Sequence, residues 1–372
     1  MALISLGKID KNLITILIGC AFCFLNRLLN QYKETLLFIN PILTNIYISI
    51  SRFLTVIPFI ILKIKTKSSK SSNNIENVNK NSIELIYNDN VEENDEGKFK
   101  YIILSAFIYL FNSICFAVSF KIQTNSWIWY ILIASIFYYM IFKVQLHKHH
   151  YVSAILIILI GLIIDLVTEN LQKEVVNDLL LLIMKFLKEI FFSLYNVIAK
   201  YVMEKKYVSV YEFSFYIGLI NLIILIIFSI FDHYYFGLYN YTDYFNNFNS
   251  TEVLVMLGVI ISQLGINLTT LFTTKNNSPC HVFIIFVFGQ LAYYINFQGV
   301  SIIVIICLIF ILFLSLIFNE IIEINILGLS YNTRNNIISR AETESLIKNE
   351  TFDEGNENLI ELKQNDNEKE NE

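Results

Sequence analysis

The chain has 372 residues, of which 55% are hydrophobic and 16% are charged, and its formal net charge is -5. Soluble domains are about 45 to 50% apolar and about 25% charged, so this composition excludes an ordinary soluble protein and predicts an integral membrane protein. The sequence contains neither a Gly-rich phosphate loop nor a nucleophile elbow, and we expect no enzymatic activity and no nucleic-acid partner.

Apolar residues are grouped in blocks of about 18 to 25 residues, the length that a helix needs to cross a hydrocarbon core of about 30 Å. The blocks lie at residues 12–29, 37–62, 101–120, 125–143, 151–168, 179–202, 211–231, 252–274, 280–297 and 299–319. They are continuously apolar and do not alternate as the strands of a membrane barrel do. The sequence therefore predicts an all-α integral membrane fold with ten transmembrane helices.

Basic residues in the short loops indicate the orientation. If residues 1–11 are cytosolic, the cytosolic side holds Lys8, Lys11, Lys143, Lys148, Lys205, Lys206, Lys275 and the Lys-rich segment 63–100. The opposite side then holds only Arg27, Lys33, Lys121 and Lys173. The positive-inside rule thus predicts that both termini are cytosolic. The first block lacks a small-residue cleavage site and should remain as an anchor.

Two segments outside the apolar blocks, 64–99 and 326–372, are polar, charged and poor in aromatic residues. Such composition predicts disordered cytosolic segments, and it accounts for most of the negative net charge. In the tail, Glu342, Leu346 and Ile347 are spaced as in the acidic dileucine signals that sorting adaptors read. This pattern favours endosomes or lysosomes, with the Golgi as the alternative.

The loop at residues 232–251 contains two glycosylation acceptor patterns, at Asn240 and Asn249. The predicted orientation places this loop on the lumenal or external side, where glycosylation occurs. The two patterns therefore agree with the orientation that the basic residues indicate.

A break at residues 169–178 divides the ten blocks into five on each side, 12–168 and 179–319. Because five is odd, the second set enters the membrane in the opposite sense to the first. The predicted architecture is therefore two inverted five-helix repeats. Secondary transporters often have this construction, with the substrate site near the midplane between the repeats.

Four stretches carry a resemblance to a known family. They are YYMIFKVQLHKHHYVSAILIILIGLII, SLYNVIAKYVMEKKYVSVYEFSFYIGLINLIIL, NNSPCHVFIIFVFGQL and LSLIFNEIIEINILGLSYNT. With the five-plus-five plan they resemble the drug/metabolite transporter (EamA-like) superfamily, which includes nucleotide-sugar transporters, and they are most similar to uncharacterised protist members. The resemblance covers about residues 12–335 and implies a solute carrier. Nucleotide-sugar and phosphate carriers often have a basic residue in the ninth helix, where this chain has Gln290, so no particular substrate is implied.

Four charges lie away from the ends of the predicted spans: Arg52 in the second block, and Lys185, Lys188 and Glu189 in the sixth. Charges at this depth are costly and face the bundle interior or a wet cavity. Lys185 and Glu189 are four residues apart and are expected to pair, whereas Lys188 points elsewhere and needs another partner. Three cations against one anion predict an anionic substrate. The alternative is structural: Lys185 reaches the surface, Lys188 pairs with Glu189 or a carbonyl, and Arg52 fixes its helix.

Other polar residues in the spans are candidates for substrate contact. Gln263 and Asn267 are four residues apart on one face of the eighth block, and Asn196 and Gln290 lie in the sixth and ninth. Interhelical hydrogen bonding is the other role open to these amides. Glu189 is in addition a candidate for proton coupling, since desolvation favours a neutral carboxyl.

No metal or cofactor is expected. His147, His149 and His150 are too few for the histidine boxes of a membrane di-iron oxygenase, and a basic cytosolic loop explains them. Cys20 and Cys23 lie in an apolar block without further ligands. Two functions remain open: a secondary-active carrier of a small polar, anionic metabolite that works by alternating access, and a non-transporting membrane scaffold or receptor. The sequence also leaves a homodimer open.

Overall fold

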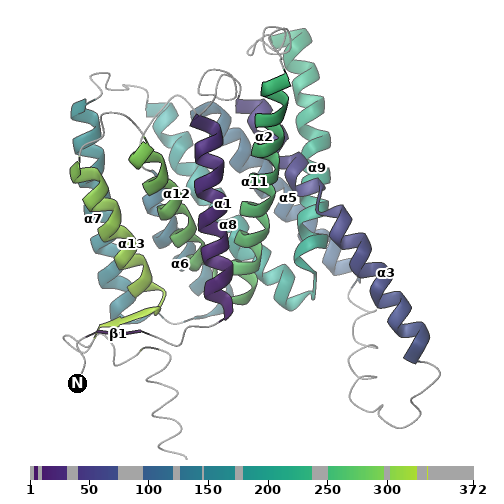
Figure 1. Cartoon of the computed structure of the whole chain (residues 1–372), viewed down its shortest axis with the longest axis horizontal. Helices are drawn as coiled ribbons and strands as arrows, with labels where there is room; N and C mark the ends of the chain where they lie inside the picture. Colours follow the sequence, from purple (N-terminus) through teal and green to yellow (C-terminus); the bar gives the residue numbers. More distant parts are fainter. Residues whose placement is uncertain are drawn as a thin grey trace, which may run out of the picture.

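The computed structural model describes residues 4–6, 11–31, 41–73, 95–119, 126–144, 146–171, 179–236, 250–296, 302–324 and 333. Helices make up nearly all of this part of the chain (Figure 1). Five are long and apolar enough to cross a membrane: Ile42–Lys65, Gly97–Ser119, Lys148–Thr168, Val210–Tyr234 and Val253–Asn276. Shorter apolar helices cover Leu13–Leu29, Ser126–Phe142, Pro279–Ile295 and Ile302–Phe318. The prediction of a helical, multi-pass membrane protein is confirmed.

The helices follow the apolar blocks of the sequence. In chain order they are α1 (Lys11–Gln31), α2 (Pro41–Phe53), α3 (Val56–Asn73), α5 (Asp95–Ser119), the 3-10 turn η1 (Ser126–Ile128), α6 (Trp129–Phe142), α7 (Lys148–Leu171), α8 (Leu179–Lys205), α9 (Val210–Phe231), the π-helical turn η2 (Asp232–Phe236), α11 (Ser250–Asn276), the 3-10 turn η3 (Pro279–His281), α12 (Val282–Asn296) and α13 (Ile302–Phe318). Each block of the sequence contains at least one of them. Two short strands, β1 (Ile4–Leu6) and β2 (Ile322–Ile324), flank the helices.

The prediction of disorder throughout residues 64–99 is wrong at both ends of that segment. Helix α3 continues to Asn73, and α5 begins at Asp95. Once a span is helical, adding each further residue is far cheaper than nucleating a helix, and Lys is a good helix former. The polar ends of these spans therefore extend the helices beyond the apolar residues. Residues 74–94 and, apart from residue 333, the predicted tail at 326–372 lie outside the described residues.

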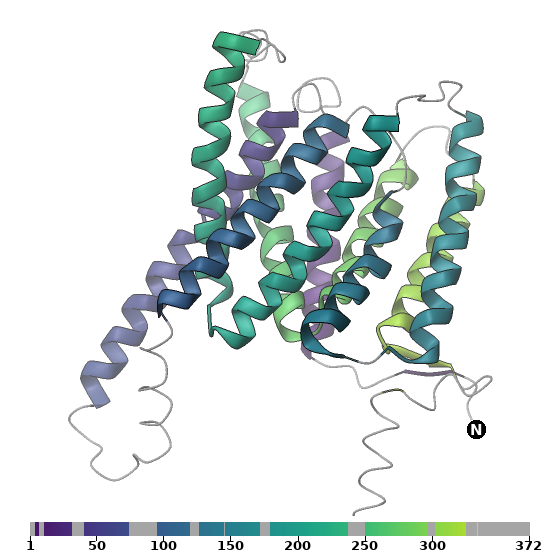
Figure 2. The same ribbon diagram turned by 180° about the vertical axis from the view of Figure 1, so that it is seen from behind.

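The helices form a bundle that contains both antiparallel and parallel neighbours (Figures 1 and 2). Helix α1 packs against α11 and α12, and α8 packs against α5 and α6. Two further pairs are α2 with α9 and α7 with α13. The two largest clusters of buried apolar residues lie around α6, α7, α12 and α13 and around α5, α8 and α9.

The two strands join the beginning of the chain to the segment after the last helix. Strands β1 and β2 are antiparallel, with Ile4 opposite Ile324 and Leu6 opposite Ile322. The chain therefore enters and leaves the bundle at the same end, which is the lower end in Figure 1. We call it the strand end.

One span is broken at mid-height. Helices α2 and α3 form the single apolar span Ile42–Lys65, which is interrupted at Leu54 and Thr55. Pro58 has no backbone N–H to give to the carbonyl four residues earlier. The Leu54 carbonyl instead accepts from the N–H of Ile57, at 3.3 Å. Proline chemistry thus accounts for a discontinuous helix at this point in the bundle.

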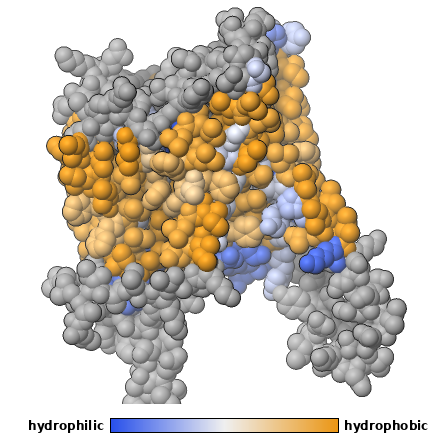
Figure 3. Space-filling model, in the orientation of Figure 1, coloured by the Kyte–Doolittle hydropathy of each residue, from blue (hydrophilic) through white to orange (hydrophobic). Residues whose placement is uncertain are grey.

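Apolar side chains cover the outside of the bundle. Figure 3 shows a continuous hydrophobic band around the middle of the visible face, with hydrophilic residues near the strand end. Among the large apolar side chains, Ile302 is 74% exposed, Leu254 70% and Leu179 69%. Soluble proteins rarely expose apolar surface on this scale, whereas a bilayer covers it.

Candidate functional site

Arg52 lies at the centre of the bundle, in the last turn of α2 before the break. Arg52 is only 4% exposed and lies near the middle of the span Ile42–Lys65. The guanidinium carbon lies 4.0 Å from the ring centroid of Tyr109 on α5 and 5.1 Å from that of Tyr195 on α8. Nη1 of Arg52 also donates a hydrogen bond to the Tyr195 hydroxyl. Three helices therefore meet around this cation.

The charge of Arg52 has no acidic partner among the described residues, since none of the salt bridges there includes it. Its Nε is buried and makes no hydrogen bond to any described protein atom. Cation–π contacts contribute about 2 kcal/mol when desolvated, whereas burying one ion costs several kcal/mol even after relaxation. The surroundings of Arg52 thus leave a net attraction for an anion.

The polar face of α11 lies against the same turn of α2. Nδ2 of Asn267 donates to Oγ of Ser51 at 2.8 Å, and Nε2 of Gln263 lies 3.4 Å from Oδ1 of Asn267. Ser51 is fully buried and directly precedes Arg52. The structure therefore brings together three predicted site residues: Arg52, Gln263 and Asn267. We call Ser51, Arg52, Tyr109, Tyr195, Gln263 and Asn267 the central cluster.

Helix α9 holds the Arg52 turn from the other side. A Cβ on Gly218 would lie 2.5 Å from the backbone nitrogen of Phe53 and 2.8 Å from Cβ of Arg52, closer than real contacts allow. Only glycine lets the two backbones approach this closely. Oγ1 of Thr55 lies 2.6 Å from the Arg52 carbonyl and 3.1 Å from the Tyr211 carbonyl on α9. The break and α9 together fix the backbone turn that carries Arg52.

The predicted arrangement of the charges on α8 is wrong for Lys188. Lys188 forms a salt bridge with its neighbour Glu189, with Nζ 2.8 Å from Oε1. The same oxygen accepts a hydrogen bond from Oγ of Ser126 at 3.0 Å. Adjacent Cβ atoms diverge by about 100°, but the flexible Lys stem bends back to the carboxylate. The Glu189 side chain is 3% exposed, so the salt bridge is buried on the side of Glu189. Lys188 thus pairs with Glu189, as the structural alternative for these charges predicts.

The other predicted site residues are dispersed. Lys185 is partly buried one turn before Glu189, and Gln290 is partly buried on α12, which packs against α1, α11 and α13. Asn196 on α8 is fully buried; Nδ2 donates to the Phe192 carbonyl at 2.9 Å, and Oδ1 makes no hydrogen bond to described atoms. The glycosylation residues Asn240 and Asn249 and the sorting residues Glu342, Leu346 and Ile347 lie outside the described residues.

Sequence reasoning missed the two tyrosines of the central cluster. Tyr195 is 1% exposed and Tyr109 5%, and their ring centroids are 5.0 Å apart. Tyrosines in membrane proteins are usually expected in the interfacial belts. The available signal was depth: both lie near the middle of their helices, as Arg52 lies near the middle of the span Ile42–Lys65.

Lys200 near the end of α8 was also missed. Its side chain is buried and donates to the carbonyls of Thr274, Lys275 and Asn277, at 3.2, 3.1 and 2.9 Å. A cation is favourable at a helix C-terminus, where the last carbonyls lack partners. Nζ also lies 2.6 Å from Oε1 of Glu204. Lys200 thus caps α11 and ties α8 to it at the strand end.

Three side chains at the strand end could hold a metal ion: His149 and His150 at the start of α7, and Glu320 after α13. Their ligand atoms lie within 4.8 Å of one another, and Nε2 of His149 is 3.0 Å from Oε1 of Glu320. Nδ1 of His150, however, accepts from the backbone N–H of His147 at 3.2 Å. The proton of a neutral His150 ring is then on Nε2. His150 therefore caps the start of α7, and the contact of His149 with Glu320 joins α7 to the end of α13.

The chain was also compared with known proteins: no protein-family model matches it, and no curated protein is significantly similar to it in sequence.

Proposed function

We propose that this protein is a secondary-active transporter that moves a small, polar, anionic metabolite across a membrane by alternating access. The observation that carries the proposal is Arg52, a cation buried at mid-height with aromatic rings and a hydroxyl around it and no carboxylate partner among the described residues. A carboxylate or phosphate group of a substrate would supply the missing counter-charge.

The proposed architecture is ten spans in two inverted repeats, 12–168 and 179–319. The packing of the helices supports it. If each helix of one half is matched with the helix five spans away in the other half, its contacts match those of its counterpart. Helix α1 packs against α11 and α12, and its counterpart α8 packs against α5 and α6. The pairs α2 with α9 and α7 with α13 each join counterparts. Helix α1 leads away from the strand end, whereas α8 leads towards it (Figures 1 and 2). This is the inversion that the repeat requires.

Alternating access needs an element that can change shape near the substrate. The break between α2 and α3 directly follows Arg52, and discontinuous helices commonly carry transporter binding sites. Rocking of the two repeats would change the surroundings of Arg52 first. The proposal places the chain in the drug/metabolite transporter superfamily, in an endomembrane with both termini cytosolic, as the basic loops of the strand end suggest.

The test is uptake into proteoliposomes of pooled labelled carboxylates, organic phosphates and neutral sugars, with and without a pH gradient. The variant is Arg52→Met. The matched control is Arg27→Met, because Arg27 is also an arginine over a tyrosine ring, 5.5 Å from the Tyr293 centroid, but lies towards the end of α1.

We expect saturable uptake of anionic solutes by the wild type and by Arg27→Met, and background uptake by folded Arg52→Met. Stimulation by the pH gradient would identify proton coupling. Uptake of neutral sugars alone, or equal loss in both variants, would refute the anion site. No uptake of any solute by well-folded wild-type protein would favour the membrane scaffold or receptor.

A further inference from the structure

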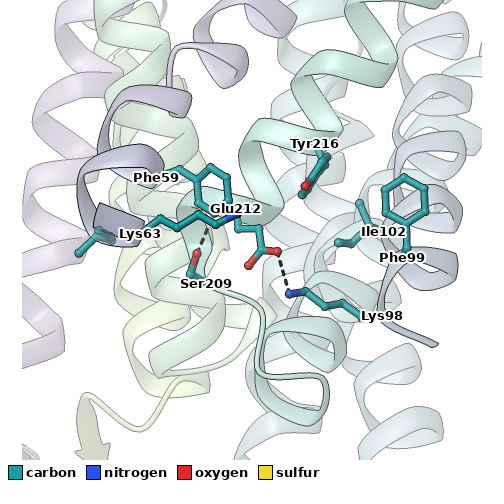
Figure 4. A pocket seen from close by; sticks show the side chains of 9 residues that line it. Phe59, Lys63, Lys98, Phe99, Ile102, Ser209, Glu212 and Tyr216 are labelled. Atoms are coloured by element: carbon teal, nitrogen blue, oxygen red, sulfur yellow. Dashed lines mark hydrogen bonds and ion pairs between the residues drawn. The ribbon is translucent and has the colours of Figure 1, made fainter. Parts of the chain in front are cut away.

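Two features at the strand end lie away from the central cluster. One is a cavity of about 650 Å³ between α3, α5 and α9, where Lys98 and Glu212 form a salt bridge at 2.7 Å that joins α5 to α9 (Figure 4). The other is the group of His149, His150 and Glu320, which we call the His–His–Glu cluster. Glu320 is 171 residues further along the chain than His149, so the spacing of the histidines alone did not indicate this cluster. Its side chains are of the types that bind transition metals.

Glu320 occupies an unfavourable position for a carboxylate. Its φ is 58°, in the left-handed region that favours glycine. It ends α13 in this conformation: its N–H donates to the Ile317 carbonyl at 3.0 Å, and the next N–H, that of Ile321, donates to the Leu316 carbonyl at 2.9 Å. The last carbonyls of a helix carry a partial negative charge, which disfavours an anion there. A cation beside Glu320 would offset this electrostatic cost.

His149 meets this carboxylate in a buried environment. The residue is 3% exposed, and its Nε2 lies 3.0 Å from Oε1 of Glu320. Nδ1 of the same ring is also buried and makes no hydrogen bond to any described protein atom. Hydrogen bonds within the described part of the chain therefore satisfy only one side of the ring. An unpaired buried polar atom of this kind is expected where a protein holds a bound water or ion.

The distances in the cluster suit an ion of the size of zinc. The ligand atoms of the three residues lie within 4.8 Å of one another, and the ring centroids of His149 and His150 are 3.9 Å apart. Zinc binds nitrogen and oxygen at about 2.0 to 2.2 Å, so the ligand atoms around a tetrahedral ion are about 3.3 Å apart. The contact of His149 with Glu320, at 3.0 Å, is already close to this spacing. Side-chain rotations can close the remaining gap.

We propose that the His–His–Glu cluster binds a divalent transition-metal ion, for which Zn²⁺ is the best match. A nitrogen of His149, a nitrogen of His150 and a carboxylate oxygen of Glu320 are the protein ligands, and water takes the fourth position. The ion replaces the proton between His149 and Glu320, which is released to solvent. Mg²⁺ and Ca²⁺ prefer oxygen ligands and do not compete. The site ties α7 to the end of α13 and does not depend on transport by the protein.

Metal binding competes with the cap that His150 forms on α7. Nδ1 of His150 accepts from the N–H of His147 at 3.2 Å, which is at the long end of the range for such hydrogen bonds. Coordination through Nδ1 takes the same lone pair, and coordination through Nε2 moves the ring proton to Nδ1. Either way the metal bond replaces one long hydrogen bond, and the start of α7 is then held by the ion.

The experiment measures metal binding by the purified full-length protein in detergent, prepared without a histidine tag and stripped with a chelator. The protein is titrated with Co²⁺, whose visible absorption reports its ligands, and then with Zn²⁺ in competition. The variants His150→Ala and Glu320→Gln each remove one ligand, whereas His150→Cys offers a thiolate in place of the imidazole. The matched control is His233→Ala, because His233 is also a histidine but lies in η2 beside Tyr234, outside the cluster.

We expect one Co²⁺ or Zn²⁺ per chain in the wild type and in His233→Ala, with a higher melting temperature when Zn²⁺ is added and no displacement by excess Mg²⁺. Loss of even an outer partner of a metal ligand weakens binding about 10- to 100-fold, so His150→Ala and Glu320→Gln should weaken it at least about tenfold. His150→Cys should keep the ion and change the Co²⁺ absorption, which a misfolded protein would not do.

Three results would overturn the proposal. The first is a wild-type protein that binds no stoichiometric metal, and the second is equal weakening in His233→Ala and in the two ligand variants. The third is metal binding that neither His150→Ala nor Glu320→Gln changes. A His150→Cys protein that melts like the wild type without metal, yet binds no metal, would also count against the cluster as the site.

Discussion

Two of the groups of charges in the apolar bundle differ in how they are compensated. On α8, Lys188 is 2.8 Å from Glu189, and Ser126 donates a hydrogen bond to the same carboxylate oxygen. On α2, Arg52 is held by the rings of Tyr109 and Tyr195 and has no carboxylate among the described residues. A buried pair that is already neutral has little to offer a ligand, whereas a buried cation without a counter-charge attracts an anion.

The comparison separates stability from function. Removing one member of the α8 pair leaves an uncompensated charge and should destabilise the protein. Removing Arg52 eliminates a buried charge and should leave the protein equally stable or more stable. If a mutation abolishes function without lowering stability, the mutated residue serves binding at the expense of stability.

The largest expected effect is that of Arg52→Met. Uptake of anionic solutes should fall to background, while the melting temperature in detergent stays level or rises because the uncompensated charge is gone. Arg52→Lys keeps the charge but loses the planar guanidinium, so it should recover only part of the uptake. A large drop in melting temperature for Arg52→Met would show that Arg52 is a structural residue and would break the comparison.

The second effect concerns the pair on α8. Glu189→Gln should destabilise the protein by about 3 kcal/mol, because Lys188 then lacks its partner. The double variant Lys188→Met/Glu189→Gln should recover most of that loss, and reversible denaturation of the single and double variants measures the cycle. Anion uptake by the double variant should persist. Loss of uptake by the stable double variant would move the substrate site to α8.

The third effect is that of Tyr195→Phe. The ring and its packing remain, but the hydroxyl that accepts from Arg52 is removed. Hydrogen bonds to charged groups contribute about 1.5 to 3 kcal/mol, and we expect a change of about tenfold in the half-saturating substrate concentration. Tyr201→Phe is the control, because Tyr201 is on the same helix and its ring lies 5.4 Å from Tyr101, outside the central cluster. Equal effects of the two variants would contradict a specific role for Tyr195.

The last effect, on stability alone, is that of Gly218→Ala, measured by thermal unfolding. The new Cβ would meet the backbone of Phe53 at 2.5 Å, so α9 and the Arg52 turn must separate, at a cost of about 1 to 3 kcal/mol. Gly97→Ala is the control, because its Cβ would meet only the end of the Lys206 side chain at 3.7 Å. If both alanines are tolerated equally, the close approach of α9 does not position Arg52.

Much of the fold follows from the sequence because apolar length is a local property. Every apolar block contains a helix, and the predicted face of Gln263 and Asn267 does lie against α2 beside Arg52. The tyrosines were missed because their role depends on which helices meet, and the spacing of residues along one helix does not contain that information. The contact of Lys188 with Glu189 was missed because helix geometry fixes the direction of Cβ but not that of a long flexible side chain.

The pairing of β1 with β2 has a consequence for the order of assembly. Ile4 is made before every described helix, and its partner Ile324 is made after all of them. Strand β1 therefore cannot pair until α13 has been synthesised and inserted. The two-stranded sheet forms late in the folding of the protein. Until then the N-terminal segment has no native partner strand, and a nascent chain that stalls before residue 322 cannot form this sheet.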